Sequence, residues 1–334
     1  MTAWDVSILI VNWNTRDILR DCLASVYGQT RDIPFEVIVV DNASSDGSAE
    51  MVRTEFPRVV LIENAENRGF AAANNQGMKI ARGRYVLLLN SDTIVLDGAI
   101  QKTVAFAEAH PEAAVVGCRV LNRDQSLQPT CFRYPSVLNM FLFATYLNKL
   151  MRRNRFFGRE RMTWWQRDDV REVEVVTGCF MLVRHEAIDR VGPMDEAFWM
   201  YGEEVDWCFR FHRAGWKILF TPCADIIHLG GASSHRAAGE MTLQLKAGVL
   251  QFLHKHTSRT EYVVACLFMA SFLALRIPFW FIRALVIGRD RPRSWSHVRA
   301  YANGLRRITG GWRGLRGLGR SEGRRCDAGK AMIA

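Results

Sequence analysis

The sequence lacks the cysteine patterns of zinc sites and disulfide-bonded scaffolds. Its eight cysteines are scattered singly, and no two of them form a Cys-x-x-Cys pair. Zinc modules and small secreted proteins usually show such pairs at regular spacings. We therefore expect a reducing compartment and a chain that folds around an apolar core. With 334 residues, 49% of them hydrophobic, the chain can bury one.

Two nucleotide-binding motifs are also missing. No Gly-x-Gly-x-x-Gly follows the first apolar run at 6–11, and no P-loop occurs anywhere in the sequence. Their absence weakens the dinucleotide-binding and P-loop NTPase classes. The first five residues lack a basic region followed by an apolar core, so we expect no signal peptide.

Most of the chain carries no excess charge. The net charge is +10, and residues 283–334 account for all of it, with 13 basic and three acidic residues. The remainder balances to zero. This distribution argues against a nucleic-acid partner and for a basic tail.

The sequence does contain a regular alternation of apolar runs and helical segments as far as about residue 120. Short apolar runs bounded by polar residues are typical of strands buried on both faces of a sheet. The alternation predicts βαβ units, and therefore an α/β fold with a mostly parallel sheet flanked by helices. The expected strands are 6–11, 35–40, 59–62, 85–89 and 114–118, and the expected helices are 17–27, one ending before Pro57, 70–81 and 100–110.

The alternation stops after that point. Residues 121–172 are expected to be irregular, basic and aromatic, and Gly178 interrupts a strand over 173–183. A helix ending near Gly215 and two short strands, at 216–220 and 225–228, complete this part of the chain.

Polar groups stand where several of these segments end or begin. In open α/β sheets, ligands bind beyond the carboxyl ends of the strands, so these groups predict a polar cleft there. A carboxylate such as Asp92 in that cleft can hold a divalent cation, and through it a diphosphate. The alternative for Asp92 is a polar transition from strand to loop that caps the next helix. The polar groups are Asp41, Asn90 with Asp92, Glu203 with Glu204, and His228.

Six motifs follow one another in a characteristic order: Ile10–Asn14, Val39–Ser48, Glu63–Asn75, Leu89–Asp92, Met200–Arg210 and His228–Gly231. Over roughly residues 5–235 this order resembles the inverting glycosyltransferases of family 2, and in particular their bacterial rhamnosyltransferase-like branch. The resemblance implies a GT-A fold, a nucleoside-diphosphate sugar donor and a divalent metal, Mg²⁺ or Mn²⁺.

The resemblance also implies a set of donor contacts. Asp41 resembles the family's contact to the nucleotide base, where its carboxylate would accept from an imide N–H. The alternatives are an Asx-type turn with Ser44 for Asp41, and a helix-start loop for residues 67–74. We expect Asp46 to cap a turn or helix. The implied donor-binding residues are Asn12, Asn14, Asp41, Asn67, Arg68, Asn74, Asn90 and Ser91.

The metal ligands follow from the same resemblance. Asp92 resembles the last residue of the family's Asp-x-Asp motif, whose first position here is Asn90. An amide offers an oxygen but no charge, so we expect Asp92 to be the principal ligand. His228 matches a position that can complete the metal shell, and its alternative is a purely structural role.

Glu203 and Glu204 occupy the family's Glu-Asp pair, in which the second carboxylate is the general base. Glu204 is one methylene longer than the usual Asp. A base must lie near the acceptor hydroxyl, on the face opposite the leaving diphosphate. Asp206 is the competing candidate, and an acidic pair that only interacts with a helix dipole is the alternative.

The last third of the chain has a helix at 243–256 and then an apolar stretch at 262–287, broken by Arg276 and Pro278. Each apolar part is shorter than the roughly 20 residues that a spanning helix needs. A span would also bury Arg276 and Arg283. We expect an interfacial or re-entrant anchor with the basic tail on anionic lipid. A buried core helix is the alternative.

Together these features predict a glycosyltransferase domain over 1–240, with a donor half at about 1–120 and an acceptor half at about 121–240. A membrane-associating helical segment at 241–290 and a disordered basic tail at 291–334 follow. The expected function is transfer of a sugar, with rhamnose as a candidate, to a saccharide or polyprenyl-diphosphate-linked acceptor. The expected setting is cell-envelope polysaccharide synthesis at the cytoplasmic face of the membrane.

Two other functions remain open. A nucleotidyltransferase that makes activated sugars would carry a Gly-rich loop with Arg and Lys after its first strand, which Asn12–Arg16 matches poorly. A non-catalytic sugar-binding scaffold would have no need of the carboxylates at 41, 92, 203 and 204.

Overall fold

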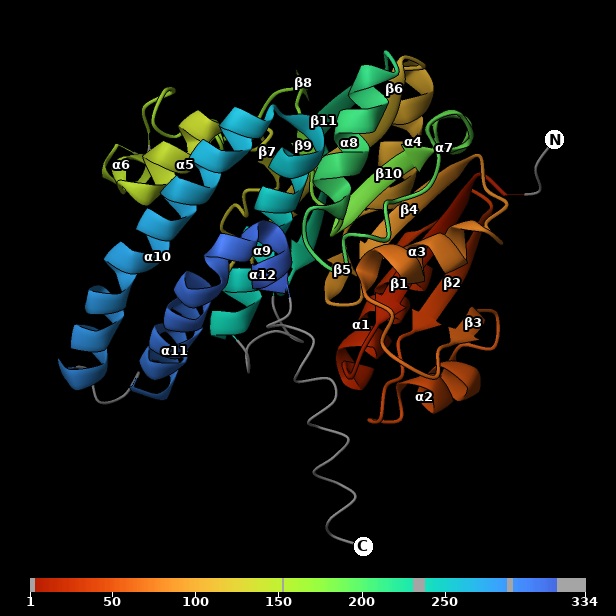
Figure 1. Cartoon of the computed structure of the whole chain (residues 1–334). Helices are drawn as coiled ribbons and strands as arrows, with labels where there is room; N and C mark the ends of the chain where they lie inside the picture. The colour runs from red at the N-terminus through yellow and green to blue at the C-terminus, as the bar shows by residue number, and fades with distance from the viewer. Residues whose placement is uncertain (1–3, 152, 231–237, 287–290, 317–334) are drawn as a thin grey trace, which may run out of the picture. The chain divides into compact units, whose positions relative to one another are not determined.

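The computed structural model describes residues 4–151, 153–230, 238–286 and 291–316, shown in Figure 1. The chain divides into two compact units. Unit 1 takes residues 1–134, 161–199 and 203–233, and unit 2 takes 135–160, 200–202 and 234–334. The sequence predicts an acceptor half that includes 135–160, whereas these residues group with the C-terminal helices instead.

Unit 1 is built on one mixed sheet. Its first half is parallel, in the order β3-β2-β1-β4, and the sheet continues through β10, β6, β11 and β5. The first four strands are β1 (Val6–Asn12), β2 (Phe35–Asp41), β3 (Val60–Glu63) and β4 (Tyr85–Asn90). The others on this path are β5 (Thr93–Val95), β6 (Ala113–Leu121), β10 (Phe180–Arg184) and β11 (Lys217–His228).

Helices cover both faces of this sheet (Figure 1). Side chains alternate across a strand, so Ile8 and Ile10 of β1 point to one face and Leu9 to the other. The first face packs against α1 (Arg16–Gln29), α2 (Ser48–Glu55) and α4 (Ala99–Ala109). The second packs against α3 (Phe70–Met78), α7 (His185–Val191) and α8 (Glu203–Arg213). This three-layer arrangement confirms the predicted α/β class.

Several elements differ from the sequence prediction. β10 runs antiparallel between β4 and β6, because a fully buried apolar strand shows the same continuous pattern in either direction. The two strands expected at 216–228 form one strand, β11, whose register shifts between Thr221 and Asp225 around Pro222. Proline cannot donate to the ladder, so the pairing breaks there. The structure has three short strands where the sequence predicts irregular structure or one interrupted strand. They are β7 (Cys131–Phe132), β8 (Arg171–Glu172) and β9 (Val175–Val176).

Unit 2 is helical in its described residues. Its elements are α5 (Val137–Ala144), α6 (Leu147–Leu150), α9 (Ala238–His256), α10 (Arg259–Val286), α11 (Arg291–Arg307), the 3₁₀ turn η3 (Ile308–Gly310) and α12 (Gly311–Arg316). The prediction of a disordered tail is therefore wrong for residues 291–316, where α11 packs on α10 through ring pairs such as Trp280 with His297. Residues 317–334 lie outside the described residues.

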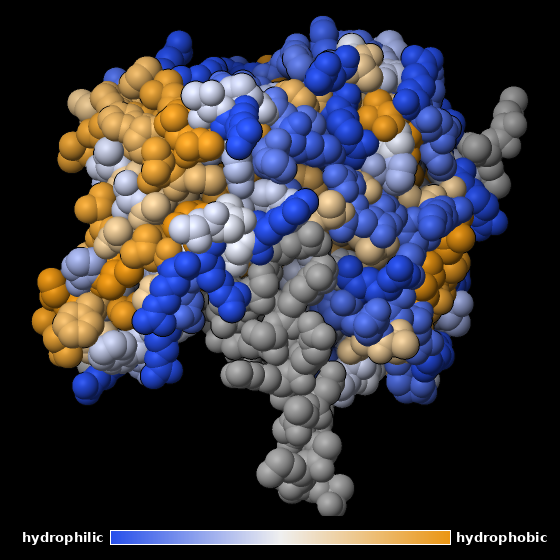
Figure 2. Space-filling model, in the orientation of Figure 1, coloured by the Kyte–Doolittle hydropathy of each residue, from blue (hydrophilic) through white to orange (hydrophobic). Residues whose placement is uncertain are grey.

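The interruption of the apolar stretch by Arg276 and Pro278 does not end the helix. α10 continues through Arg276 and Pro278 for 28 residues. It is the one helix among the described residues that is long and apolar enough to cross a membrane, judged by length and composition. Figure 2 shows hydrophobic residues gathered along the α10 side of unit 2, beside hydrophilic residues on α11.

Arg276 is tolerated in this helix because carbonyl groups and aromatic rings of unit 2 surround its guanidinium. The buried guanidinium donates to the carbonyls of Phe143, at 2.9 Å, and Ala144, at 3.5 Å. It also lies 3.7 Å from the Phe272 ring centroid and 3.9 Å from that of Tyr146. These carbonyls form the C-terminal end of α5, which favours a cation. Burial nonetheless holds the pKa of Arg276 below its ordinary value. Arg276 thus ties α10 to α5.

Candidate active site

Part of the polar set expected at the sheet edge lies on neighbouring strand ends. Asn12 pairs with Asp41 across β1 and β2, and Asn90 pairs with Val11 across β4 and β1. His228, at the end of β11, pairs with Thr93 of β5, three residues beyond Asn90. These strands therefore present Asn12, Asp41, Asn90 and His228 at one edge of unit 1, whereas Glu203 and Glu204 begin α8.

A buried network links the ends of β1, β2 and β4. The Asn12 side chain donates to Asp41 Oδ2 at 3.0 Å and accepts from Thr15 Oγ1 at 2.6 Å. Thr15 Oγ1 in turn lies 3.2 Å from Ser91 Oγ. Asp41 Oδ1 accepts from the Ser44 N–H at 2.8 Å, which is the Asx-type turn. A carboxylate accepts several hydrogen bonds, so this turn and a contact to a nucleotide base are compatible.

Asn14 and Asp46 shape the loops above this network. Asn14 has a positive φ of 54°, and its side-chain oxygen accepts from the Ser45 N–H at 2.7 Å. Asp46 accepts from the backbone N–H groups of Arg16, at 2.8 Å, and Ser48, at 3.0 Å, which begin α1 and α2. Burial opposes its charge, but the hydrogen bonds from Ser48 and Arg16 hold the pKa of Asp46 below its usual range. The structure thus supports the expected capping role of Asp46.

The residues before α3 divide into exposed and buried groups. Asn67 accepts from the Gly69 N–H at 3.0 Å, in a local turn. Arg68 is exposed, and within the described residues its side chain forms no ion pair. Asn74 is buried inside α3 and donates to the Phe70 carbonyl at 3.0 Å. Arg68 is therefore positioned to meet an anion, whereas Asn74 stabilises the helix.

α3 also holds the segment that leads into α8, a contact that the sequence did not indicate. The Phe70 N–H donates to the Trp199 carbonyl at 2.8 Å. Asn75 donates to the Met194 carbonyl at 2.9 Å and accepts from the Met194 N–H at 3.0 Å. The approach is close because Gly69 has no side chain: a Cβ there would lie 2.3 Å from the Trp199 oxygen.

Three carboxylates lie in the first turn of α8, and their surroundings differ. Asp206 is fully buried and pairs with Arg210 at 2.8 Å. Arg210 also donates to the carbonyls of Val191, at 3.1 Å, and Pro193, at 2.7 Å. Glu203 is buried and Glu204 is half-buried. Asp206 therefore has a structural task, and Glu204 is the most accessible of the three.

Asp92, Asn90 and His228 form the centre of the site. His228 Nε2 lies 3.2 Å from Asp92 Oδ1 and 3.2 Å from Asn90 Nδ2. His228 Nδ1 lies 2.6 Å from the side-chain oxygen of Gln128, a residue that the sequence did not single out. Asp92 is only 8% exposed.

These atoms fit a divalent cation that also binds a substrate. Among the described residues no group of three or more His, Cys, Asp or Glu is placed to hold a metal. Asp92 and His228 supply one oxygen and one nitrogen ligand. Mg²⁺ typically uses one or two carboxylates and leaves its other positions to water and substrate phosphates, and an imidazole nitrogen is acceptable to Mn²⁺. The donor set therefore suits a metal–diphosphate pair.

Two buried thiols lie close to Asp92. Burial raises the pKa of Cys22 to about 12 and that of Cys179 to about 11. The thiolate is the nucleophilic form, so neither thiol is a nucleophile near neutral pH.

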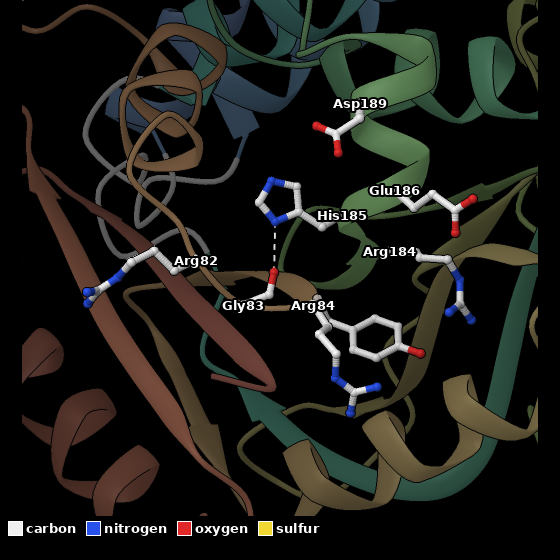
Figure 3. Close-up of a pocket in the computed structure, with 8 residues that line it drawn as sticks. Arg82, Gly83, Arg84, Arg184, His185, Glu186 and Asp189 are labelled. Carbon is white, nitrogen blue, oxygen red and sulfur yellow. Dashed lines mark hydrogen bonds between the residues drawn. The ribbon is translucent and has the colours of Figure 1, made fainter. Parts of the chain in front are cut away.

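A cavity of about 620 Å³ lies elsewhere in unit 1, where β4 begins (Figure 3). His185 Nδ1 lies 2.7 Å from the Gly83 carbonyl oxygen at this cavity. Its arginines are already engaged: Arg82 with Glu36 and Arg84 with Asp5, both at 2.7 Å, and Arg184 with the Ala107 carbonyl at 2.8 Å. This cavity is at the opposite end of β4 from Asp92. It is therefore not the predicted cleft.

Known proteins resemble this chain in sequence. The profile of Glycosyl transferase family 2 matches residues 7–192. An N-acetylglucosaminyl-diphospho-decaprenol L-rhamnosyltransferase from Mycobacterium tuberculosis is 28% identical over 240 residues, which cover 69% of this chain and 77% of that protein. The low-salt glycan biosynthesis hexosyltransferase Agl10 from Haloferax volcanii is 22% identical over 291 residues, which cover 82% and 85% of the two chains.

A solved structure resembles the fold. The mannosyltransferase PcManGT from Pyrobaculum calidifontis, in complex with GDP-Man and Mn²⁺, matches with a TM-score of 0.55 and 17% sequence identity. The match covers 90% of this chain and 87% of that one. It confirms the GT-A type of fold.

The close approach of Gly69 to Trp199 can be tested by adding one methyl group. Gly69 and Gly192 have nearly the same backbone angles, φ 84° and ψ 176° against φ 88° and ψ 172°, but a Cβ at Gly192 meets nothing within 4 Å. Both Ala variants carry the same backbone strain. Gly69→Ala should lower the free energy of unfolding by about 1–3 kcal/mol more than Gly192→Ala, because it also overpacks the contact. Urea denaturation measures the difference. Equal losses would mean that the Trp199 contact is not held in solution.

Proposed function

The chain belongs to glycosyl transferase family 2, and we propose that it transfers one sugar from a nucleoside-diphosphate donor with inversion at the anomeric carbon. The observation that carries the proposal is the 3.2 Å approach of His228 Nε2 to Asp92 Oδ1 at the carboxyl edge of the sheet. That edge is where α/β sheets bind ligands, and the two side chains suit a cation that holds a diphosphate.

The donor contacts proposed for unit 1 follow its polar network. Asp41 keeps acceptor capacity for a base N–H beyond its bonds to Asn12 and Ser44. Arg68 offers an exposed guanidinium to the diphosphate. Asn14, Asn67, Asn90 and Ser91 line the same loops. We assign Asn12 and Asn74 to support of these loops, because both side chains are buried and bonded within the protein.

Asp92 and His228 are the proposed ligands of Mg²⁺ or Mn²⁺. A bound divalent cation would neutralise the charge that develops on the leaving diphosphate. Asn90 Nδ2 lies 3.2 Å from His228 Nε2, and its neutral amide adds no charge to the site. The protein contributes one negative charge, that of Asp92, so binding of the cation and of the diphosphate should reinforce each other.

Glu204 is the proposed general base. It would take the proton of the acceptor hydroxyl as that oxygen attacks the anomeric carbon opposite the diphosphate. Glu203 is proposed to support it from the same helical turn. Asp206 is not proposed as the base, because its carboxylate is buried against Arg210.

The proposed acceptor is a saccharide, carried on a polyprenyl diphosphate, in cell-envelope polysaccharide synthesis. The support is the name of the mycobacterial relative, which transfers rhamnose to a diphospho-decaprenol-linked sugar and aligns with 69% of this chain. Rhamnose is the corresponding candidate donor sugar. A nucleotidyltransferase remains disfavoured, because the family match and the loop after β1 both differ from that class.

A lipid-linked acceptor requires access to a membrane, and unit 2 offers a suitable surface. One side of α10 packs inward through Ala265, Met269, Phe272, Leu273 and Arg276. From Val263 onward, the opposite side is exposed and, apart from Ser271, apolar. The exposed residues on α10 that form this apolar stripe are Val263, Leu267, Ala274, Leu275, Pro278, Phe279, Phe281, Ile282, Leu285 and Val286.

The neighbouring helix supplies charge of the right sign. α11 contains five arginines and no acidic residue. Because α11 packs beside α10, a bilayer-spanning α10 would draw these arginines toward the hydrocarbon, at a high cost in free energy. An interfacial position lets the apolar stripe enter the acyl layer while the arginines meet anionic head groups. We therefore propose peripheral attachment to the cytoplasmic face of the membrane.

The metal proposal predicts the behaviour of Asp92→Asn. The amide keeps the shape but removes the charge, so donor affinity measured with Mn²⁺ should fall to the value that the wild type shows in excess EDTA. Transfer should be abolished. Asp97→Asn is the matched control, since Asp97 is an exposed carboxylate of the same segment that pairs with Lys102. Full wild-type transfer in EDTA would contradict the metal assignment.

The base proposal separates Glu204 from Asp206. Glu204→Gln should lower turnover by roughly 10²-fold or more with donor affinity unchanged, because general-base catalysis contributes about that much. Asp206→Asn should instead lower the free energy of unfolding by about 3–5 kcal/mol, because it leaves the Arg210 charge without its partner. Rapid-quench transfer assays and urea denaturation distinguish the two. A stable but inactive Asp206→Asn, with a near-normal Glu204→Gln, would reverse the assignment.

The membrane proposal is tested on the full chain with vesicles. Wild type should sediment with vesicles that contain phosphatidylglycerol, less so at high salt. The double variant Leu267→Glu, Leu275→Glu should bind at least about tenfold more weakly, since burial of one Leu is worth roughly 1.5–3 kcal/mol. Ile80→Glu, an exposed apolar residue of unit 1, is the control. A wild type that does not sediment with vesicles, or that dimerises through the apolar stripe, would contradict attachment to lipid.

A further inference from the structure

The turn that follows β6 brings a glutamine back to the site. Leu121 bridges to Leu127, the Asn122 N–H donates to the Ser126 carbonyl at 2.8 Å, and the Gln128 N–H donates to the Val120 carbonyl at 2.9 Å. The sequence predicts only irregular structure here. The turn instead folds back on β6, which pairs with β11, and so places Gln128 beside His228.

A chain of side-chain hydrogen bonds runs through this turn to His228. Gln128 Oε1 lies 2.6 Å from His228 Nδ1, and Gln128 Nε2 lies 2.8 Å from Asn122 Oδ1. Asn122 Nδ2 lies 2.9 Å from Ser126 Oγ, which lies 2.6 Å from Asp124 Oδ1. This series of hydrogen bonds therefore begins at the Asp124 carboxylate and ends at the His228 imidazole.

The Asp124 carboxylate fixes which group donates in every hydrogen bond of this series. An ionised carboxylate only accepts hydrogen bonds, and the hydrogen bonds from Ser126 hold the pKa of Asp124 below its ordinary value. The Ser126 hydroxyl must therefore donate to Asp124, so its oxygen accepts from the Asn122 amide nitrogen. The Asn122 oxygen is then left to face the amide nitrogen of Gln128.

A second contact agrees with this direction. Gln128 Nε2 also lies 3.3 Å from the backbone carbonyl oxygen of His228. With two acceptors beside it, this atom must be the donating nitrogen of the amide. The other end of the amide, Oε1, therefore faces the ring, and the bond to His228 Nδ1 forms only when Nδ1 carries a proton.

The position of that proton determines what His228 can bind. In a neutral imidazole with its proton on Nδ1, Nε2 carries a lone pair and no proton. Nε2 is the atom that faces Asp92 Oδ1 and Asn90 Nδ2, each at 3.2 Å. A nitrogen lone pair and a carboxylate oxygen that point into the same space form a natural pair of ligands for a cation.

We propose that Gln128 is a positioning residue that directs the Nε2 lone pair of His228 toward a divalent cation, and that Asn122, Ser126 and Asp124 set the orientation of its amide. The proposal rests on the proposed function, in which Asp92 and His228 hold the metal. Hydrogen bonds of this kind to the second ring nitrogen orient histidine ligands and typically change metal affinity by 10–100-fold.

The first test measures metal binding by the full chain. Gln128→Met keeps the length of the side chain and removes both hydrogen bonds. Gln125→Met makes the same change on an exposed side chain of the same turn. Mn²⁺ alone, and Mn²⁺ with inorganic pyrophosphate, are titrated by electron paramagnetic resonance. Gln128→Met should bind Mn²⁺ roughly 10–100-fold more weakly than wild type, and Gln125→Met should match wild type. Equal affinity of the two variants would overturn the proposal.

The second test reads the proton directly and needs neither metal nor activity. In metal-free wild type with ¹⁵N-labelled histidine, the nitrogen shifts of His228 should show the proton on Nδ1, and His228→Gln identifies its signals. In Gln128→Met this preference should be lost. A wild-type proton on Nε2 would overturn the proposal even if Gln128→Met failed to fold.

The two tests separate the proposal from the function on which it rests. If wild type binds no Mn²⁺, with or without pyrophosphate, the metal assignment of Asp92 and His228 fails. The proposal that Gln128 directs His228 toward a metal then fails with it, whereas the tautomer measurement still shows whether Gln128 controls the ring. If wild type binds Mn²⁺ and Gln128→Met binds it equally well, only the role of Gln128 is wrong.

Discussion

The buried side-chain amide of Asn12 is the interaction on which the site depends. It joins the end of β1 to Asp41 at the end of β2 and, through Thr15, to Ser91 beyond β4. A buried polar group that is fully hydrogen-bonded holds its neighbours in one arrangement, because any other arrangement leaves a group without a partner in a low-dielectric interior. The loops that carry Asp41 and Asp92 thus share one rigid support.

The amino-terminal half of this architecture could be predicted because its signal is local. β1, β2 and β4 are continuous apolar runs, and each ends abruptly in the polar residues that the site uses. The prediction brought Asn90, Asp92 and His228 to one place, and the structure does the same. The direction of β10 could not be predicted in this way, because its buried run has no feature that depends on its partners.

The remaining differences depend on contacts between residues distant in sequence. Asp206 has the pattern of a catalytic carboxylate, but it is paired with Arg210, which the carbonyls of Val191 and Pro193 hold in place. In the sequence, Gln128 has no feature that marks it, and only the turn at 121–127 brings it beside His228. In the sequence, Arg276 interrupts an apolar segment, whereas in the structure it donates to the C-terminal carbonyls of α5. In each case one side chain is explained by a partner that no pattern in the sequence identifies.

The contact between Phe70 and Trp199 has a consequence for how phosphate is held. A helix N-terminus is ordinarily an anion site, since its first N–H groups point outward with a partial positive charge. In α3 the Phe70 N–H is already donated to the Trp199 carbonyl, which joins the helix to the segment before α8. The Phe70 N–H is therefore used within the protein and cannot also bind a phosphate. The sequence has no glycine-rich phosphate-binding loop, and this N–H group does not replace one. In the proposed function, neutralising the donor diphosphate then falls to groups that can exchange, namely the proposed cation and the solvent-exposed Arg68. The same proposal lets the charged product leave together with its cation, without any opening of the backbone.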